Sequence, residues 1–148
     1  TYGTFYPLFS VSTKGVLAYL NGVPGQLSRA TWFDRQGKAQ GTIGEPGSFY
    51  GLALSPDATK VAAGLANKSG QTDLWMLDLT RENLTRFTFA QRSLNVSPLW
   101  SPDGSRIVFS SSYEAILYKL YHKSSSGAGN EEPLHSDESN YYAASRPN

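Results

Sequence analysis

The chain has 148 residues, of which 39% are hydrophobic and 17% charged, with a formal net charge of +1 and a pI near 7.9. This composition is too apolar for a disordered chain, and the weak net charge offers no broad basic surface for a nucleic acid. Because the chain has no cysteine, disulfides, thiolate catalysis and sulfur-ligated zinc sites are excluded.

Taken in chain order, two markers indicate an internal repeat. An apolar residue followed by serine recurs at intervals of 45 and 46 residues, at Phe9-Ser10, Leu54-Ser55 and Trp100-Ser101. Each pair begins seven residues before an apolar β-branched residue, namely Val16, Val61 or Ile107. An aromatic residue recurs at intervals of 43 residues, at Trp32, Trp75 and Tyr118. A fixed period of this length is typical of propellers and solenoids.

The middle repeat predicts four short strands, at residues 49–54, 61–65, 73–79 and 84–88. Turn residues follow the first strand of the second and third repeats, at Ser55-Pro56-Asp57 and Ser101-Pro102-Asp103-Gly104. Ala58 stands where the third repeat has Gly104, so we expect that turn to differ or to be strained. In the first repeat Val11-Ser12-Thr13 replaces the turn sequence, which predicts a looser hairpin.

The fold class predicted from these strands is all-β. No segment shows convincing helical periodicity, and four antiparallel strands in each repeat predict a partial β-propeller of about three four-stranded antiparallel blades. The expected blades cover approximately residues 5–48, 49–92 and 95–137, and residues 141–148 begin a truncated fourth blade. A β-sandwich is the structural alternative, although a sandwich does not require two markers at a fixed period.

Several of these segments resemble a known family. The turn at residues 101–104 with the strand after it, and the segment at residues 73–79, resemble the repeat of the TolB-like, WD-repeat-like six-bladed propellers. Residues 15–19, 32–38, 44–47 and 85–89 are similar to the propellers attached to bacterial serine/threonine kinases and winged-helix regulators, although the chain has no kinase motif. The resemblance implies the fold and a periplasmic or extracytoplasmic location, but many unrelated functions share such a fold.

Aromatic side chains are the candidate packing residues. Trp32, Trp75 and Tyr118 recur with the repeat, and Trp100 ends a predicted strand, so we expect these four residues to pack between blades. The alternative is an aromatic binding face, because Trp and Tyr are frequent at interface hot spots.

We predict no catalytic, cofactor-binding or metal-binding residues. The two histidines, His122 and His135, lack an evident set of further ligands, and Asp57, Asp78 and Asp103 recur with the turns. The turn serines lie in no Gly-x-Ser-x-Gly motif, and residues 124–130 lack the lysine and following helix of a phosphate-binding loop.

The sequence thus favours a non-catalytic propeller module that binds a protein, peptide or small ligand, as the sensory or scaffolding part of a larger bacterial protein. The alternatives are the propeller domain of a prolyl-oligopeptidase-type enzyme, or a truncated fragment with no ligand. We expect no nucleic-acid partner, and no membrane insertion by this segment because it has no run of about 18 apolar residues. A homodimer or missing blades would complete the ring.

Overall fold

The computed structural model describes residues 9–12, 14–21, 26–89, 93–113 and 117–134. Within these ranges the chain forms strands and no helix, so none of the described residues belongs to a helix that could cross a membrane. The strands are β1 (Phe9–Val11), β2 (Leu17–Asn21), β3 (Leu27–Phe33), β4 (Ala39–Leu54), β5 (Lys60–Ala66), β6 (Thr72–Asp78), β7 (Asn83–Arg86), β8 (Ser93–Trp100), β9 (Arg106–Tyr113), β10 (Lys119–Ser124) and β11 (Glu132–Pro133).

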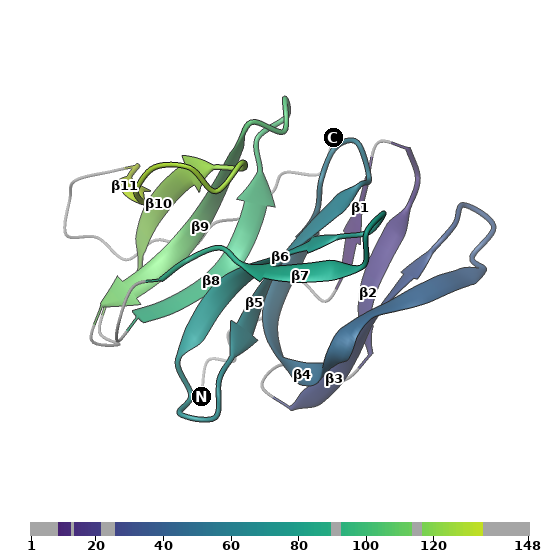
Figure 1. The fold of residues 1–148 in the computed structure, drawn as a ribbon, viewed down its shortest axis with the longest axis horizontal. Coiled ribbons are helices and arrows are strands. Elements are labelled where there is room, and N and C mark those ends of the chain that lie inside the picture. Colours follow the sequence, from purple (N-terminus) through teal and green to yellow (C-terminus); the bar gives the residue numbers. More distant parts are fainter. Residues whose placement is uncertain (1–8, 13, 22–25, 90–92, 114–116, 135–148) are drawn as a thin grey trace.

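The described strands divide into three four-stranded blades, and within each blade consecutive strands pair in antiparallel fashion (Figure 1). Strand β4 belongs to two blades, because its first part pairs with β3 and its last part, from Ser48 onward, pairs with β5. The first blade is therefore β1 to β3 with the start of β4, the second is the end of β4 with β5 to β7, and the third is β8 to β11. A single parallel pairing, Thr72 with Leu94, joins β6 of the second blade to β8 of the third. The chain is an all-β partial propeller, as the sequence predicted.

Strands β5, β6 and β7 lie within two residues of the predicted bounds. The first strand, predicted at residues 49–54, is the last part of β4, which begins ten residues earlier, at Ala39. The predicted fourth strand ended at residue 88, whereas β7 ends at Arg86. The backbone N–H groups of Phe87 and Thr88 nevertheless donate to the carbonyl of Leu74, so this segment continues along the edge of β6. The expected blade bounds remain predictions because each range includes residues outside those described, and the expected fourth blade at residues 141–148 lies outside them entirely.

Backbone pairing corrects the predicted register of the first repeat. The N–H of Ser12 donates to the carbonyl of Val16, as Ser55 does to Lys60 and Ser101 does to Arg106. Ser12, and not Ser10, is therefore the turn serine of the first blade. The error has two causes: this turn is one residue shorter than the other two, and Leu17, not Val16, is the first-blade equivalent of Val61. The Ser12 hydroxyl accepts a 3.1 Å hydrogen bond from the Val16 N–H. The looser hairpin expected at Val11-Ser12-Thr13 stays a prediction, because Thr13 lies outside the described residues.

The aromatic marker is also out of register. Trp75 pairs with Ala63 and Tyr121 pairs with Phe109 at equivalent places in the second and third blades. Trp32 pairs with Ala18 in the first blade. The equivalent pairs are Met76 with Ala62 in the second blade and His122 with Val108 in the third, so Trp32 corresponds to Met76 and His122. Tyr118 precedes β10. The 43-residue spacing is therefore a coincidence of unequal loop lengths.

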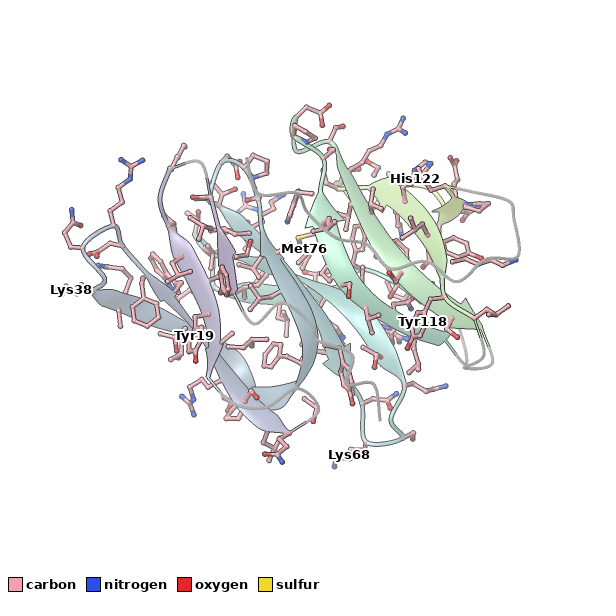
Figure 2. The ribbon with its side chains drawn as sticks, turned by 180° about the vertical axis from the view of Figure 1, so that it is seen from behind. Tyr19, Lys38, Lys68, Met76, Tyr118 and His122 are labelled. Carbon is pink, nitrogen blue, oxygen red and sulfur yellow. The ribbon has the colours of Figure 1, made fainter. Side chains whose placement is uncertain are left out.

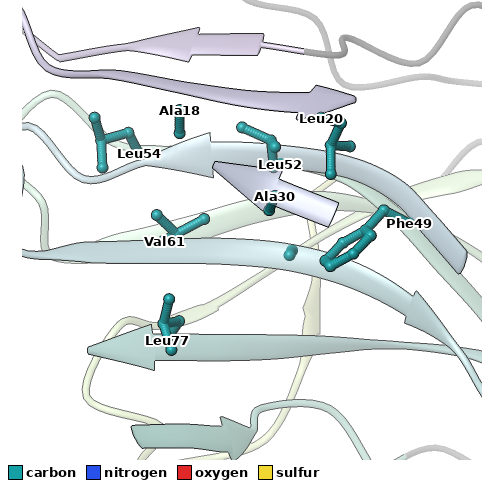
Figure 3. Close-up of a cluster of buried hydrophobic side chains, with 9 residues drawn as sticks. Ala18, Leu20, Ala30, Phe49, Leu52, Leu54, Val61 and Leu77 are labelled. Carbon is teal, nitrogen blue, oxygen red and sulfur yellow. The ribbon is translucent and has the colours of Figure 1, made fainter. Parts of the chain in front are cut away.

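Two hydrophobic clusters hold the three blades together. The first joins the first and second blades and consists of Ala18, Leu20, Ala30, Phe49, Leu52, Leu54, Val61, Ala63 and Leu77 (Figure 3). The second joins the second and third blades and consists of Ala62, Leu74, Phe87, Ile107 and Phe109. Val61 and Ala63 thus face one neighbouring blade while Ala62 faces the other, because successive side chains of a strand point to opposite faces.

The inner strands β4 and β8 contain bulges at equivalent positions, between Phe49 and Leu52 and between Val96 and Leu99. Gly51 has φ +94° and Ser97 has φ +52°, so both bulges use left-handed backbone. The two bulges touch, since a Cβ added to Gly51 would lie 3.3 Å from the Cα and N of Ser97. This close approach brings the inner strands of adjacent blades together.

Candidate functional site

The turn residues singled out in the sequence form two similar hydrogen-bonded turns. In the second blade the Ser55 hydroxyl accepts from the Lys60 N–H at 2.9 Å and donates to a carboxylate oxygen of Asp57 at 2.7 Å. Asp57 also accepts from the N–H and hydroxyl of Thr59. The hydrogen bond from Ser55, followed by that from the Thr59 N–H, lowers the pKa of Asp57.

The third-blade turn repeats this arrangement. The Ser101 hydroxyl donates to Asp103 at 2.6 Å and accepts from the Arg106 N–H at 2.9 Å. Together with the N–H and hydroxyl of Ser105, the Ser101 hydroxyl lowers the pKa of Asp103 to about 2. These serine hydroxyls bond to carboxylates and to their own turns, and neither makes a hydrogen bond to histidine within the described residues.

The two turns lie side by side at one end of the blades. Pro56 of the second turn lies against the third turn, since a Cβ added to Gly104 would be 3.8 Å from its Cδ. Pro102, the equivalent proline of the third turn, is exposed. Ala58 has φ +60°, close to the +72° of Gly104, so the second turn has the same shape as the third and a strained alanine. Each turn is engaged in its own hydrogen bonds, and we see no convergent set of free polar groups there.

The four aromatic residues have different surroundings, although all four are half-buried. Trp32 packs against the first hydrophobic cluster, and Trp100 packs against the second and donates from Nε1 to the carbonyl of Ala53 in the second blade. Trp75 lies in β6, and Tyr118 lies just before β10. Trp32 and Trp100 thus make direct contacts of the kind expected for packing between blades.

The histidines do not form a site in the part of the chain that the structure describes. His122 lies 3.7 Å from a carboxylate oxygen of Glu132, while His135 is outside the described residues. Among the described side chains no group of three or more His, Cys, Asp or Glu residues is placed to hold a metal ion.

A cluster of charged and aromatic side chains at the junction of the second and third blades is the strongest candidate site. We call it the Phe89 cluster, and it consists of Asp73, Arg86, Phe87, Thr88, Phe89, Asn95 and Lys123. It forms because residues 87–89 leave β7 and run along β6 toward the third blade. Lys123 enters from β10 of that blade.

A polar network fixes the inner part of the cluster. Asp73 accepts from Arg86 at 2.6 Å and from the hydroxyl of Thr88 at 3.1 Å. Thr88 is fully buried, and its hydroxyl also accepts from the Leu74 N–H at 2.9 Å and from the side-chain amide of Asn95 at 3.2 Å. This network ties the outer edge of the second blade to the inner strand of the third.

Two cations flank the exposed ring of Phe89. The Arg86 guanidinium lies 5.3 Å and the Lys123 ammonium 5.6 Å from the ring centroid, within the range of cation–π attraction. Lys123 is only 5% exposed, donates to the carbonyl of Phe87 at 3.0 Å, and also lies 5.1 Å from the Phe87 ring. Phe89 itself is 63% exposed, so the cluster presents a large apolar ring to solvent on a rigid polar base.

The Phe89 cluster was not among the sites predicted from the sequence. The alternation of Arg86, Phe87, Thr88 and Phe89 after a predicted strand was a local signal for it. Nothing local pointed to Lys123, which is 36 residues from the carbonyl that it contacts.

Comparison with known proteins supports the fold. No protein-family model matches the chain. TolB from Acinetobacter baumannii is similar in structure, with a TM-score of 0.71, 17% identity, and 86% of this chain aligned to 31% of that chain. The putative TolB from Agrobacterium tumefaciens has a TM-score of 0.71 and 21% identity, with 87% of this chain aligned to 46% of that chain. A chain from a study of two prolyl endopeptidases has a TM-score of 0.68 and 14% identity, with 88% of this chain aligned to 22% of that chain.

The chain spans less than half the length of each of these three proteins. At such identities the likeness establishes the fold alone. The chain therefore has the TolB-like β-propeller fold.

Proposed function

We propose that this chain, part of a propeller with the TolB-like fold, is a non-catalytic module that binds a protein or peptide through the exposed ring of Phe89. The observation that carries the proposal is the 63% exposure of a phenylalanine held beside Arg86, on a base fixed by the Asp73–Thr88–Asn95 network. Aromatic residues and arginine are enriched at the centres of protein interfaces, and a rigid support lowers the entropic cost of binding.

The chemistry of the cluster favours an apolar anchor on the partner. Arg86 is already paired with Asp73, and Lys123 is buried beneath the rings, so neither cation is free to form an exposed ion pair. The surface that remains available is the Phe89 ring itself and the Arg86 side chain, which is 41% exposed. A peptide with an apolar or aromatic side chain next to a hydrogen-bond acceptor matches these two groups.

The experiment is a selection of phage-displayed random dodecapeptides on the folded chain, followed by calorimetry with the selected synthetic peptides. Phe89→Ala should weaken their binding about tenfold or more, as expected for an interface hot spot. Leu84→Ala is the matched control, since Leu84 is also exposed, at 40%, but lies on β7 outside the cluster. A selection that yields no binders, or binders that tolerate Phe89→Ala, contradicts the proposal.

A second candidate function is a role as the propeller domain of a prolyl-oligopeptidase-type enzyme whose catalytic domain lies on another segment. Similarity to a prolyl endopeptidase chain supports it. The flanking coding sequence separates the two candidates, because an adjoining hydrolase domain favours the second and a sensory or scaffolding architecture favours the first. Absence of both would favour the truncated fragment.

Two further parts of the proposal concern the setting of the module. The TolB-like fold supports a periplasmic or extracytoplasmic location in a bacterial parent protein. We also propose that the open ends of the three-blade arc are completed by further blades or by a second copy of the chain.

A further inference from the structure

The outer edge of the second blade is exposed, although this blade has a neighbour on each side. Figure 2 shows Met76 of β6 at the middle of the arc, between Tyr19 of the first blade and His122 of the third. All four residues of β7, Asn83–Arg86, are exposed, and among the described strands β7 pairs only with β6. Because blades pack through their faces, further blades beyond either end of the arc would leave this edge open.

The backbone of β7 presents free hydrogen-bonding groups along this edge. The N–H of Phe87 donates to the carbonyl of Leu74 in β6. Since backbone groups alternate in direction along a strand, the N–H and C=O groups of Leu84 and Arg86 point away from β6. Within the described part of the chain, the backbone of neither residue bonds to another group. Four backbone groups are therefore available to an extended peptide.

The outer strands of the other two blades have features that prevent pairing with another chain. In the first blade the outer strand is the start of β4, and its pairing with β3 shifts in register twice. In the third blade β11 has only two residues, one of which is Pro133. Bulges, prolines and short strands protect exposed edges in native proteins. Strand β7 contains no glycine or proline, and its pairing with β6 has no register shift, so it is the outer strand best suited to pair with another chain.

We propose that a peptide binds as a fifth strand of the second blade, paired with β7, and that its apolar residue opposite Arg86 contacts the Phe89 ring. Residues opposite each other on paired strands have neighbouring side chains. The Arg86 guanidinium lies 5.3 Å from the centroid of the Phe89 ring, so a side chain opposite Arg86 lies beside that ring. The inference rests on the proposed binding at Phe89, and it adds the conformation and the position of the bound peptide.

This edge suits a short peptide better than a second copy of the chain. Strand β7 has four residues and spans only about 13 Å, whereas a stable protein interface buries roughly 1,200–2,000 Å² in total. A peptide that adds one strand to β7 uses main-chain hydrogen bonds for affinity and its side chains for selectivity. The free backbone groups and the adjoining Phe89 ring supply both kinds of contact.

The experiment is an N-methyl scan of the Phe89-dependent peptides selected on the folded chain, with calorimetry as the readout. Methylation of an amide nitrogen removes its N–H, and only alternate N–H groups of a paired peptide point toward β7. Methylation should therefore weaken binding about tenfold or more at every second residue around the apolar anchor, and about threefold or less at the residues between them.

A pair of chain variants tests the same contact from the other side. Leu84→Pro removes an outward-pointing N–H from an edge strand, whereas Leu84→Ala retains it and is the matched control. Leu84→Pro should weaken binding about tenfold, and Leu84→Ala about threefold or less. Circular dichroism checks that both variants are folded. In the wild-type chain, amide hydrogen exchange at Leu84 and Arg86 should slow when the peptide binds, which needs no substitution.

The inference and the proposed function can fail separately. Peptides that lose binding in Phe89→Ala but tolerate N-methylation at every position, with no change in exchange at Leu84 and Arg86, would overturn the strand pairing and leave the function at Phe89 intact. A selection that yields no binders would overturn both. A dimer of the chain without peptide, detected by light scattering and abolished by Leu84→Pro, would assign the edge to a second copy and would also overturn the inference.

Discussion

The indole N–H of Trp100 donates a 2.9 Å hydrogen bond to the carbonyl of Ala53, although the two residues are 47 positions apart. Trp100 ends the inner strand of the third blade, and Ala53 lies near the end of the inner strand of the second. Their contact joins adjacent blades at the end where the Ser-Pro-Asp turns lie. A similar link joins the first two blades, where the Ser10 hydroxyl accepts from the Leu54 N–H at 3.0 Å.

Replacement of Trp100 by Phe should lower the free energy of unfolding by about 1–3 kcal/mol, because the ring is largely kept while a part-buried hydrogen bond is lost. Equilibrium urea denaturation measures the change. Trp75→Phe is the control for reduced ring size, since the Trp75 indole makes no hydrogen bond within the described residues. Equal losses in the two variants would show that the Ala53 contact contributes no stability.

Gly51→Ala should destabilise the chain more than Gly37→Ala. Both glycines have positive φ, +94° and +75°, so alanine is strained at either position by about 1–2 kcal/mol. At Gly51 the new Cβ would also lie 3.3 Å from the backbone of Ser97, whereas nothing lies within 4 Å at Gly37. We expect the excess at Gly51 to be about 1 kcal/mol or more, measured by urea denaturation. A smaller loss at Gly51 would mean that the inner strands separate easily.

Thr88→Val should lower the free energy of unfolding by about 1–3 kcal/mol, because it removes the buried hydroxyl that bonds Asp73, Leu74 and Asn95 while keeping the side-chain shape. Thr85→Val, at an exposed position on β7, should change stability by less than about 0.5 kcal/mol. Thermal and urea denaturation of both variants test this expectation. If Thr88→Val is neutral, the polar network does not fix the base of the Phe89 cluster.

Asp103 should titrate in the folded chain with a pKa of about 2, below its usual 3.8. Because the pKa is lower in the folded chain, the ionised carboxylate stabilises the turn at pH values above the unfolded-state pKa of 3.8. This stabilisation is lost as the pH falls from about 4 through about 2. Carbon-13 NMR of the side-chain carboxyl measures the titration. Ser101→Ala should raise the pKa because the Ser101 hydroxyl is the largest cause of the shift, while Ser126→Ala should have no effect. An unchanged pKa in Ser101→Ala would contradict the observed hydrogen bonding.

The features that sequence alone determined are local ones. Short β-branched and aromatic runs, separated by Ser-Pro-Asp turns, identified the strands of the middle repeat, because strand propensity and turn chemistry depend on neighbouring residues. The turn residues could be identified for the same reason, since Ser101 and Asp103 are two positions apart. The approximate period was enough to indicate blades.

Tertiary structure alone decided the register of the repeats and the contents of the candidate site. Ser12 and Tyr121 hold the positions that the sequence spacing assigned to Ser10 and Tyr118. Loops of unequal length separate the strands, so the equivalent residues can be identified only from the backbone pairing of the strands. The hydrogen bond from Lys123 to Phe87 in the Phe89 cluster joins residues 36 positions apart, and Lys123 stands where the second blade has the buried Leu77. Packing of one blade on the next brings that lysine to the Phe87 carbonyl, and no local pattern in the sequence specifies such a contact.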